Sequence, residues 1–224
     1  MRIFLDTANI DDVAKHFITG LIDGVTTNPT LIRNSGKNPT DVYKELSQIG
    51  VRDISMEVHG SAKEMYESGK RLAHDFHGVA TIKLPMTRCG LLACKELSKD
   101  HIRTNVTLVF TIPQAILAAK AGATYVSPFV GRLDDQQVSG LEVVRGIKGL
   151  YAAKRVETQV LAASIRSVHR AVRSFYNGAD VVTMPPSVFE DMYKHILTDA
   201  GLKIFENDIA QTQCNSVNFI KEYQ

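Results

Sequence analysis

The 224-residue sequence predicts an α/β fold, a (βα)8 TIM barrel with an extra C-terminal helix. Eight short, often β-branched runs alternate strictly with longer helix-like stretches, and eight parallel strands are the number that closes this barrel. Neither G-x-G-x-x-G nor G-x-x-x-x-G-K-[ST] follows any strand, which disfavours a doubly wound open sheet. No linker, repeat or low-complexity stretch divides the chain. We therefore expect one domain over residues 1–224, in which about 199–224 form a helical extension.

The strands are expected at the β-branched runs, and the helices at the periodic stretches between them. The predicted strands are Arg2–Asp6, Asp23–Thr27, Asp53–Val58, Val79–Leu84, Arg103–Leu108, Tyr125–Phe129, Thr158–Ser164 and Asp180–Met184. The predicted helices are Asp11–Ile18, Asp41–Gln48, Ser61–Phe76, Cys89–Lys99, Ile112–Lys120, Gln136–Lys154, Ser167–Asn177 and Val188–Leu197. Ser61 and Glu64 form the S-x-x-E pattern of a capping box, and Pro113 suits a first helical turn.

Composition and charge are those of an ordinary globular protein. Hydrophobic residues make up 44% and charged residues 22%, and the formal net charge of +2 gives no sign of nucleic-acid or membrane binding. Cys89, Cys94 and Cys214 show no C-x-x-C spacing, which favours a reducing compartment over a disulfide framework or a zinc site. The N-terminus lacks a signal-peptide core, and no apolar run reaches the about 18–20 residues of a membrane span. We expect a cytoplasmic protein whose anionic ligands, if any, are small molecules.

Polar residues gather on one face of the predicted strands. Side chains alternate between the two faces of a strand, so residues two apart share a face. In a barrel we expect the apolar set to face the helices and the polar set to face the interior, with its last member near the C-terminal end, where TIM-barrel active sites are assembled. The residues assigned to the interior are Phe4 and Asp6; Gly24, Thr26 and Asn28; Asp53, Ser55 and Glu57; Thr81 and Lys83; Asn105 and Thr107; and Ala162 and Ser164. The same pattern on six strands favours a functional site.

Lys83 is the most informative of these residues. It lies within the apolar run TIKLP, where a lysine must either pair with a carboxylate or lose its charge. Burial lowers the pKa of a lysine and makes its amine a nucleophile towards carbonyl groups. A structural salt bridge to Asp6 or Glu57 is the alternative, and spacing alone does not decide between the two. No residue cluster suggests a metal, since His74 and His77 lie late in an amphipathic helix.

Two arginines follow the sixth and seventh predicted strands closely. Arg132 and Arg166 are suited to bidentate phosphate recognition, and phosphate sites are common at these late loops of the fold. A single loop arginine is usually a solvated surface charge. Two at the same rim, with Ser164 beside one of them, make a phosphate site as good an interpretation as two surface charges.

Six segments occur in order along the predicted strands: DTAN at 6–9, GVTTNPTL at 24–31, KLP at 83–85, NVTLVF at 105–110, SPFVGR at 127–132 and AASIRS at 162–167. Together they resemble the transaldolase family, in the short, single-domain subfamily that also includes the fructose-6-phosphate aldolases. The similarity runs from Met1 to about Leu202, and GVTTNPT and SPFVGR are its most specific parts.

The resemblance implies a role for each site residue. Lys83 would form a Schiff base with the ketose donor, Asp6 would shuttle the proton during carbon–carbon cleavage, and Glu57 and Thr107 would hold the catalytic water. The remaining residues would bind substrate. Asn28, Asn105 and Ser127 would bind the dihydroxyacetone hydroxyls, Thr26 would support Asp6, Phe129 would line the site, and Arg132, Ser164 and Arg166 would hold the phosphate. No cofactor and no metal are implied.

Within the family that this sequence resembles, two positions distinguish enzymes that transfer the dihydroxyacetone unit from enzymes that release it. Transaldolases typically carry Glu on the third strand and Phe after Ser-Pro on the sixth, as Glu57 and Phe129 do here, whereas the aldolases carry Gln and Tyr. The sequence therefore favours transfer of a dihydroxyacetone unit from sedoheptulose 7-phosphate or fructose 6-phosphate to glyceraldehyde 3-phosphate or erythrose 4-phosphate, in the pentose phosphate pathway. A fructose-6-phosphate aldolase that releases free dihydroxyacetone is the nearest alternative. A non-catalytic sugar-phosphate-binding barrel is a more distant one, since it need not retain Asp6, Glu57, Lys83 and Thr107.

The C-terminal extension is expected to concern assembly. In the resembled subfamily the last helix tends to reach a neighbouring subunit of a pentameric or decameric ring. Phe205, Ile209 and Phe219 could supply such contacts, or could cover the barrel of their own chain. We therefore expect a homo-oligomer on the resemblance alone.

Overall fold

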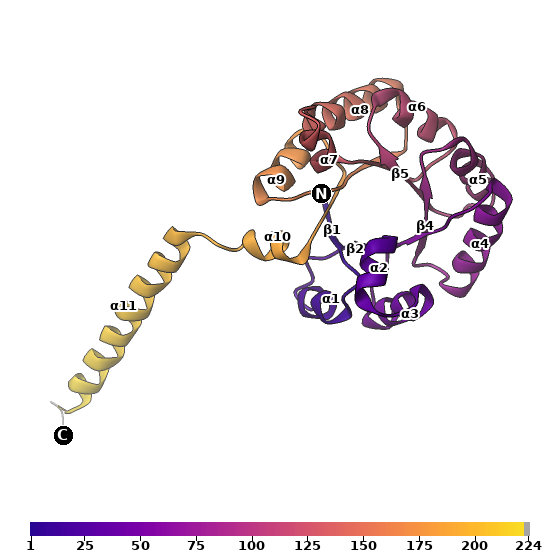
Figure 1. Cartoon of the computed structure of the whole chain (residues 1–224). Coiled ribbons are helices and arrows are strands. Elements are labelled where there is room, and N and C mark those ends of the chain that lie inside the picture. The colour runs from indigo at the N-terminus through magenta and orange to yellow at the C-terminus, as the bar shows by residue number, and fades with distance from the viewer. Residues whose placement is uncertain (222–224) are drawn as a thin grey trace. The chain divides into compact units, whose positions relative to one another are not determined.

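The protein folds as a closed barrel of eight parallel strands surrounded by helices, as the sequence predicts. In the computed structural model the strands follow one another around the ring in chain order, and β1 closes it by pairing with β8. Viewed along the barrel axis, the strands of residues 1–189 form the inner ring and helices of the same residues lie around them (Figure 1). The structure describes residues 1–221 of the backbone and residues 1–212 of the side chains.

Each predicted strand is present, with its ends shifted by at most two residues. The strands are β1 (Arg2–Asp6), β2 (Gly24–Thr26), β3 (Ile54–Glu57), β4 (Ala80–Pro85), β5 (Thr104–Val109), β6 (Tyr125–Pro128), β7 (Gln159–Ala162) and β8 (Val181–Met184). The helices are α1 (Ile10–Phe17), α2 (Pro29–Ser35), α3 (Pro39–Ile49), α4 (Ala62–Asp75), α5 (Arg88–Lys99), α6 (Ile112–Lys120), α7 (Val130–Asp135), α8 (Gly140–Lys154), α9 (Val168–Tyr176), α10 (Pro186–Asp191) and α11 (Ile196–Lys221).

Local sequence signals account for several helix starts. Ser61 and Glu64 form the predicted capping box of α4, and Thr111 and Gln114 form a second one at α6, where Pro113 lies in the first turn. Helix α2 was not predicted, although its signals are present. Asn28 caps it, Pro29 is its first residue, and Gly36 ends it in the left-handed conformation.

Two predicted helices are wrong in their extent. The helix expected at Gln136–Lys154 begins only at Gly140, because Gln137 has a φ of 59° and Ser139 caps a new helix. A separate short helix, α7, precedes it. The helix expected at Val188–Leu197 is divided, since α10 ends at Asp191 and α11 starts at Ile196.

The chain divides into two compact units, residues 1–189 and residues 190–224, so the expectation of one domain stays a prediction. The first unit holds all eight strands. The second contains α11, whose start at Ile196 lies slightly before the predicted extension from about residue 199. The side chains of Cys214 and Phe219 lie outside the described residues. Among residues 1–221, no helix is long and apolar enough to cross a membrane.

Alternation along the strands separates two apolar cores. The larger core lies between strands and helices and includes Leu5, Ile54, Ile82 and Val106. The smaller one fills the barrel interior with residues of the opposite parity: Phe4, Tyr125, Leu161, Ala163 and Val181. Gly24 makes room for it, because a Cβ there would lie only 2.7 Å from the Phe4 ring and 2.7 Å from the Asp53 carbonyl oxygen.

A polar network closes the barrel interior at the N-terminal ends of the strands. Asp53 is only 4% exposed, and its carboxylate accepts hydrogen bonds from Tyr125 Oη at 2.7 Å and Thr81 Oγ1 at 2.7 Å. Arg2 donates to Tyr125 Oη at 2.8 Å. Burial and the neighbouring Asp53 raise the pKa of Tyr125 to about 12, so the phenol stays a donor to the carboxylate. With this end filled, the interior can open only at the other end.

Candidate active site

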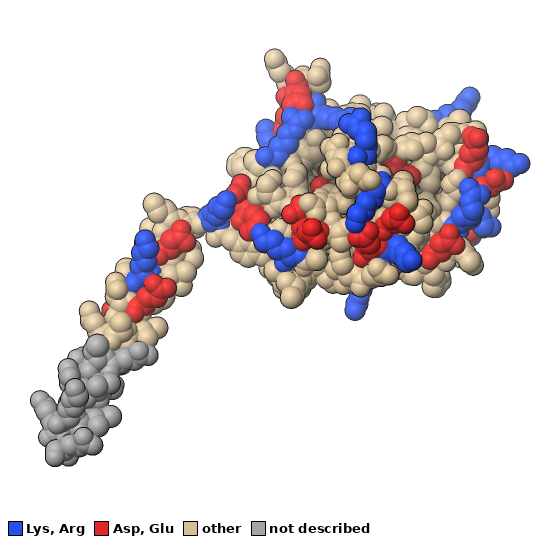
Figure 2. Space-filling view, turned by 60° about the horizontal axis from the view of Figure 1, so that its bottom comes forward, with Lys and Arg blue, Asp and Glu red and all other residues tan. Residues whose placement is uncertain are grey.

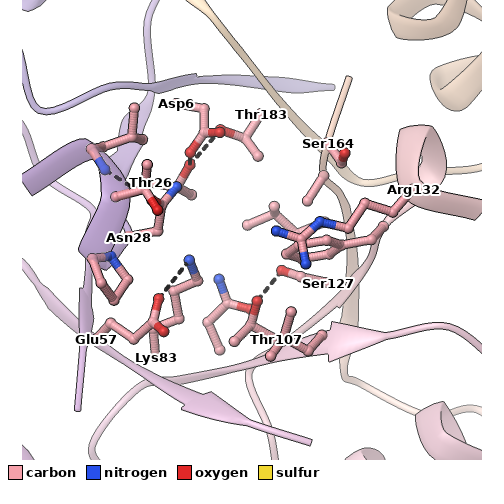
Figure 3. Close-up of a pocket in the computed structure, with 18 residues that line it drawn as sticks. Asp6, Thr26, Asn28, Glu57, Lys83, Thr107, Ser127, Arg132, Ser164 and Thr183 are labelled. Carbon is pink, nitrogen blue, oxygen red and sulfur yellow. Dashed lines mark hydrogen bonds and ion pairs between the residues drawn. The ribbon is translucent and has the colours of Figure 1, made fainter. Parts of the chain in front are cut away.

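A cavity of about 450 Å³ opens at the C-terminal ends of the strands. Figure 3 shows polar side chains converging on it from different strands. All but one of the predicted site residues line it: Asp6, Thr26, Asn28, Glu57, Lys83, Asn105, Thr107, Ser127, Phe129, Arg132 and Ser164. Arg166 does not line it. The convergence expected from strand parity is therefore confirmed for the members of this set that parity placed correctly, which are Asp6, Thr26, Asn28, Glu57, Lys83, Asn105 and Thr107.

Lys83 lies at the base of the cavity, between β3 and β5. It is paired in register with Glu57 on β3, so the two side chains stand next to each other on the inner face. Its Nζ is 3.0 Å from Glu57 Oε2 and donates to the Thr27 carbonyl oxygen at 2.8 Å. Lys83 is 6% exposed. The other carboxylate oxygen of Glu57 is 3.7 Å from Nε2 of the largely exposed His59. Of the two carboxylate partners that the sequence offered for Lys83, the structure pairs it with Glu57.

Asp6 ends β1 and faces Lys83 across the cavity mouth (Figure 3). Thr26 Oγ1 donates to Asp6 Oδ1 at 2.7 Å, and because that proton is then committed, the hydroxyl of Thr183 at 2.7 Å must donate to Thr26. Burial raises the pKa of Asp6, and the nearby Lys83 and the Thr26 hydrogen bond only partly oppose this. Asp6 therefore holds a proton at higher pH than an ordinary carboxyl group.

Asn105 on β5 and Ser127 on β6 orient each other. Ser127 Oγ donates to Asn105 Oδ1 at 2.7 Å, and Asn105 Nδ2 donates to Ser55 Oγ at 3.2 Å. Both residues are buried. Asn28 is held differently, since its Oδ1 accepts the Leu31 amide at the start of α2 at 3.0 Å. Its amide nitrogen is the group that it can present to a ligand.

Thr107 presents a buried hydroxyl to the cavity. Among the side chains of residues 1–212, its Oγ1 is the buried polar atom without a hydrogen-bond partner. The residue that follows it, Leu108, has a φ of 60°, and the pairing of β5 with β6 shifts register between Val106 and Val109. A buried hydroxyl without a partner is unfavourable by roughly 1–3 kcal/mol. Such a group is suited to bind a water molecule or a substrate atom that enters the cavity.

Phe129 and Arg132 form the wall on the side of β6 and α7. The Arg132 guanidinium lies over the Phe129 ring, 5.1 Å from its centroid, and Phe110 packs edge-on against the same ring at 5.7 Å. Arg132 points into the cavity opposite Lys83 (Figure 3). The stacking holds a permanent positive charge at the mouth, where an anionic end of a ligand can reach it.

The parity predicted for the seventh strand is wrong. Leu161 and Ala163 line the cavity, whereas Ala162 packs in the core between strands and helices. Ser164 still lines the cavity because β7 ends at Ala162 and Ser164 has a φ of 60°, which breaks the alternation. Ser164 was therefore predicted correctly as a cavity residue, although the parity used to predict it was wrong.

Arg166 lies outside this cavity. It borders an adjoining hollow together with Arg132, and its guanidinium forms a two-point ion pair with Asp135, with Nη2 2.7 Å from Oδ2. The pair is half-exposed. Arg166 therefore does not line the cavity in this arrangement, although its Nε lies against Gly131, as Ser164 Oγ does.

Thr183 is a site residue that the sequence reasoning missed. It lines the cavity from β8 and completes the hydrogen-bonded chain Thr183–Thr26–Asp6. Applying the period-two rule to β8 would have placed Val181 and Thr183 on the inner face, because these residues alternate with Val182 and Met184.

The charges on the barrel are mixed rather than gathered. Figure 2 shows Lys and Arg side chains interleaved with Asp and Glu over the face in view. Among the described side chains, no group of three His, Cys, Asp or Glu residues lies close enough together to hold a metal ion. The charged groups of the cavity are those of Asp6, Glu57, Lys83 and Arg132.

This chain is similar to known proteins over nearly its whole length. Residues 3–223 match the family model described as Transaldolase/Fructose-6-phosphate aldolase. A protein of Caulobacter vibrioides named "Probable transaldolase" is 48% identical over 213 residues, which are 95% of this chain and 98% of that protein. Proteins of the same name from Bartonella tribocorum and Thermodesulfovibrio yellowstonii are each 45% identical, over 96% and 93% of this chain and 99% and 97% of their own lengths.

Proposed function

The chain belongs to the transaldolase/fructose-6-phosphate aldolase family and is a transaldolase, and we propose that it works through a Schiff base on Lys83. In this reaction a three-carbon dihydroxyacetone unit moves from a ketose phosphate to an aldose phosphate, a step of the pentose phosphate pathway. The observation that carries the assignment of Lys83 is its buried amine at the base of a polar cavity, 3.0 Å from the Glu57 carboxylate.

The first stage joins the donor to Lys83. The neutral amine attacks the ketose C2 carbonyl, an N–C bond forms, and the carbonyl oxygen becomes a hydroxyl group that must leave as water. Glu57 takes a proton from the lysine ammonium to give the neutral amine, and it then passes two lysine protons in turn to the oxygen, the first to form the hydroxyl group and the second to release it as water. The unpaired Thr107 hydroxyl supports a role in holding that water. The product is an iminium ion, which withdraws electrons from the bond to be cleaved.

The second stage breaks the carbon–carbon bond. The Asp6 carboxylate takes the proton from the C4 hydroxyl, the C3–C4 bond breaks, and its electron pair moves through C3–C2 to the iminium nitrogen. The aldose phosphate leaves and the three-carbon enamine stays on Lys83. An acceptor aldehyde then enters, the enamine carbon attacks it, and Asp6 returns its proton to the new alkoxide. The Thr26 and Thr183 hydroxyls support this role by orienting Asp6.

The binding groups divide between the two ends of the substrate. We assign Asn28, Asn105 and Ser127 to the hydroxyls of the dihydroxyacetone part, since they surround the amine and carry oriented donors and acceptors. Arg132 and Ser164 lie at the opposite wall and suit a phosphate group. Phe129 supports transfer rather than release, because its ring carries no hydroxyl that could bring a proton to the enamine.

Reduction with borohydride in the presence of fructose 6-phosphate tests the assignment of Lys83. We expect a stable adduct that peptide mass mapping places on Lys83, and no adduct in K83M. As a matched control, K148M removes a lysine that pairs with Asp180 at 2.6 Å outside the cavity, and should keep the Lys83 adduct. Absence of the adduct in the folded, unaltered protein would show that the mechanism is wrong.

Comparing fructose 6-phosphate alone with fructose 6-phosphate plus erythrose 4-phosphate tests transfer against release. Turnover should depend on the acceptor. Equal rates with and without it would indicate an aldolase that releases dihydroxyacetone.

We further propose that the protein assembles as a homo-oligomer through α11. Within the unit of residues 190–224, large apolar side chains are exposed: Ile196, Leu197, Leu202, Ile204, Phe205 and Ile209. Apolar surface of this extent favours burial against another surface. Sedimentation velocity should detect a species several times larger than the 24.7 kDa chain, and F205E should shift it towards smaller species. A monomer at all concentrations would contradict this proposal.

A further inference from the structure

Arg166 is engaged by a carboxylate of its own chain. Both terminal nitrogens of its guanidinium meet the two oxygens of Asp135, the last residue of α7, in the planar arrangement that a phosphate group would also satisfy. This contact lowers the pKa of Asp135 and raises that of Arg166, so both groups stay charged. Asp135 thus occupies the face of Arg166 that an anionic ligand would bind.

The rest of the Arg166 side chain lies next to the cavity. A Cβ added at Gly131 would be 2.9 Å from Arg166 Nε and 3.1 Å from Ser164 Oγ, so both atoms lie against the same glycine. Arg132 borders the cavity and also the hollow that holds Arg166. Only the end of the Arg166 side chain is directed away, towards Asp135.

We propose that Asp135 and the substrate phosphate compete for Arg166, which makes Asp135 a specificity-determining residue. The inference rests on the proposed function, because it takes the ligand of Arg132 and Ser164 to be a sugar phosphate. With no phosphate present, Asp135 neutralises Arg166. When a phosphate reaches Arg132 and Ser164, Arg166 exchanges the carboxylate for it.

The charge of the ligand determines whether it can displace the Asp135 carboxylate from Arg166. The Asp135 carboxylate carries a single negative charge and its pair with Arg166 is half-exposed, which makes it a weak pair. A phosphate monoester carries about 1.5–2 negative charges near neutral pH and meets two arginines at once. A neutral sugar end cannot displace Asp135, and a singly charged sugar acid gains little by doing so. The exchange therefore favours phosphorylated substrates over both.

Calorimetric titration with inorganic phosphate tests the competition without any turnover. In D135N, Arg166 loses its competitor, and we expect phosphate to bind about two- to fivefold more tightly. D134N is the matched control. It removes the same charge from the neighbouring residue, which pairs with Arg170 at 3.0 Å and not with Arg166. D134N should leave the phosphate affinity near that of the unaltered protein.

Combining D135N with R166M distinguishes competition for Arg166 from a general repulsion between the Asp135 carboxylate and phosphate. In an R166M background, D135N should no longer tighten phosphate binding. The KM for fructose 6-phosphate should follow the same pattern as the phosphate affinity.

Three results would overturn the proposal: unchanged or weaker phosphate binding in D135N, an equal gain in D134N, or a gain that persists in R166M. Circular dichroism confirms that each variant is folded, and D135S provides a second test if D135N is not. Because phosphate binding needs no Schiff base, a failure at Asp135 stays distinguishable from a failure of the borohydride experiment at Lys83.

Discussion

Replacing Thr107 by valine should raise stability and lower activity together. Thr107 is 1% exposed, and within the described side chains its buried hydroxyl has no hydrogen-bond partner. Valine keeps the shape and removes the group. An unsatisfied buried hydroxyl is unfavourable by roughly 1–3 kcal/mol, and we take the lower end because the residue lines a cavity that water can enter. For a chain of 224 residues, a gain of about 1 kcal/mol raises the Tm by about 2–4 °C.

The same change removes a group that we assign to holding the water of the Schiff-base step. General acid–base contributions of this kind are typically 10²–10⁴-fold, so we expect kcat to fall by at least about 100-fold. The opposite signs of the two effects are the signature of a group retained for function and not for folding.

Thr81 provides a matched control on the neighbouring strand. It is also buried and faces the interior, but its hydroxyl donates to Asp53 at 2.7 Å in the network that closes the far end of the barrel. T81V loses a hydrogen bond to a carboxylate, which contributes about 1.5–3 kcal/mol, and should lower the Tm by about 3–12 °C. Its kcat should be unchanged, since it lies outside the cavity.

Thermal unfolding followed by circular dichroism measures the stability of T107V and T81V, and a coupled assay with fructose 6-phosphate and erythrose 4-phosphate measures kcat. If T107V lost as much stability as T81V, the Thr107 hydroxyl would have a structural partner and the reasoning would be wrong. If T107V kept full kcat, its assigned role in the water step would be wrong.

Two further predictions concern Asp6 and Phe129. Because burial raises the pKa of Asp6, kcat of the unaltered protein should fall on acidification at a pH above the usual range of an Asp, and D6N should lose this limb together with about 10²–10⁴-fold in kcat. The raised pKa also means that ionised Asp6 lowers the stability of the folded state at any pH above the ordinary pKa of an Asp. D6N should therefore have a higher Tm than the unaltered protein at neutral pH, and this difference should vanish as the pH falls below the ordinary pKa of an Asp. A D6N protein that is less stable than the unaltered protein at pH 7 would contradict this prediction. F129Y should raise the release of dihydroxyacetone from fructose 6-phosphate without acceptor by about tenfold, on the premise that a nearby phenol can supply a proton to the enamine. F110Y, which changes the neighbouring ring outside the cavity, should leave product partitioning as it was, and an unchanged F129Y would refute the role given to that position.

Most of the fold could be predicted because its signals are local. Strand alternation has a period of two residues and depends only on the extended backbone, so it assigned Asp6, Glu57, Lys83 and Thr107 to one interior. The same rule places Thr183 on the inner face of β8. The helix expected at 136–154 starts only at Gly140, and this was missed because the positive φ of Gln137 has no clear signature in the sequence.

The seventh strand shows where the local rule ends. Ser164 reaches the cavity only because its backbone leaves the extended conformation, with a φ of 60°, while the Gly131 amide donates to its carbonyl oxygen at 3.0 Å. That bond joins residues far apart in the sequence. The sequence pattern of the strand alone therefore cannot predict this hydrogen bond.

The sequence by itself determined the barrel, its polar interior and the residues available for the reaction, because the apolar and polar periods are properties of short segments. Only the tertiary structure decided how those residues are engaged. It places Glu57 against Lys83 by strand register, leaves the Thr107 hydroxyl without a partner among the described side chains, and turns Arg166 towards Asp135. Hydrogen bonds and ion pairs form between atoms a few ångströms apart, and for residues on different strands and loops that distance is set by the closed fold.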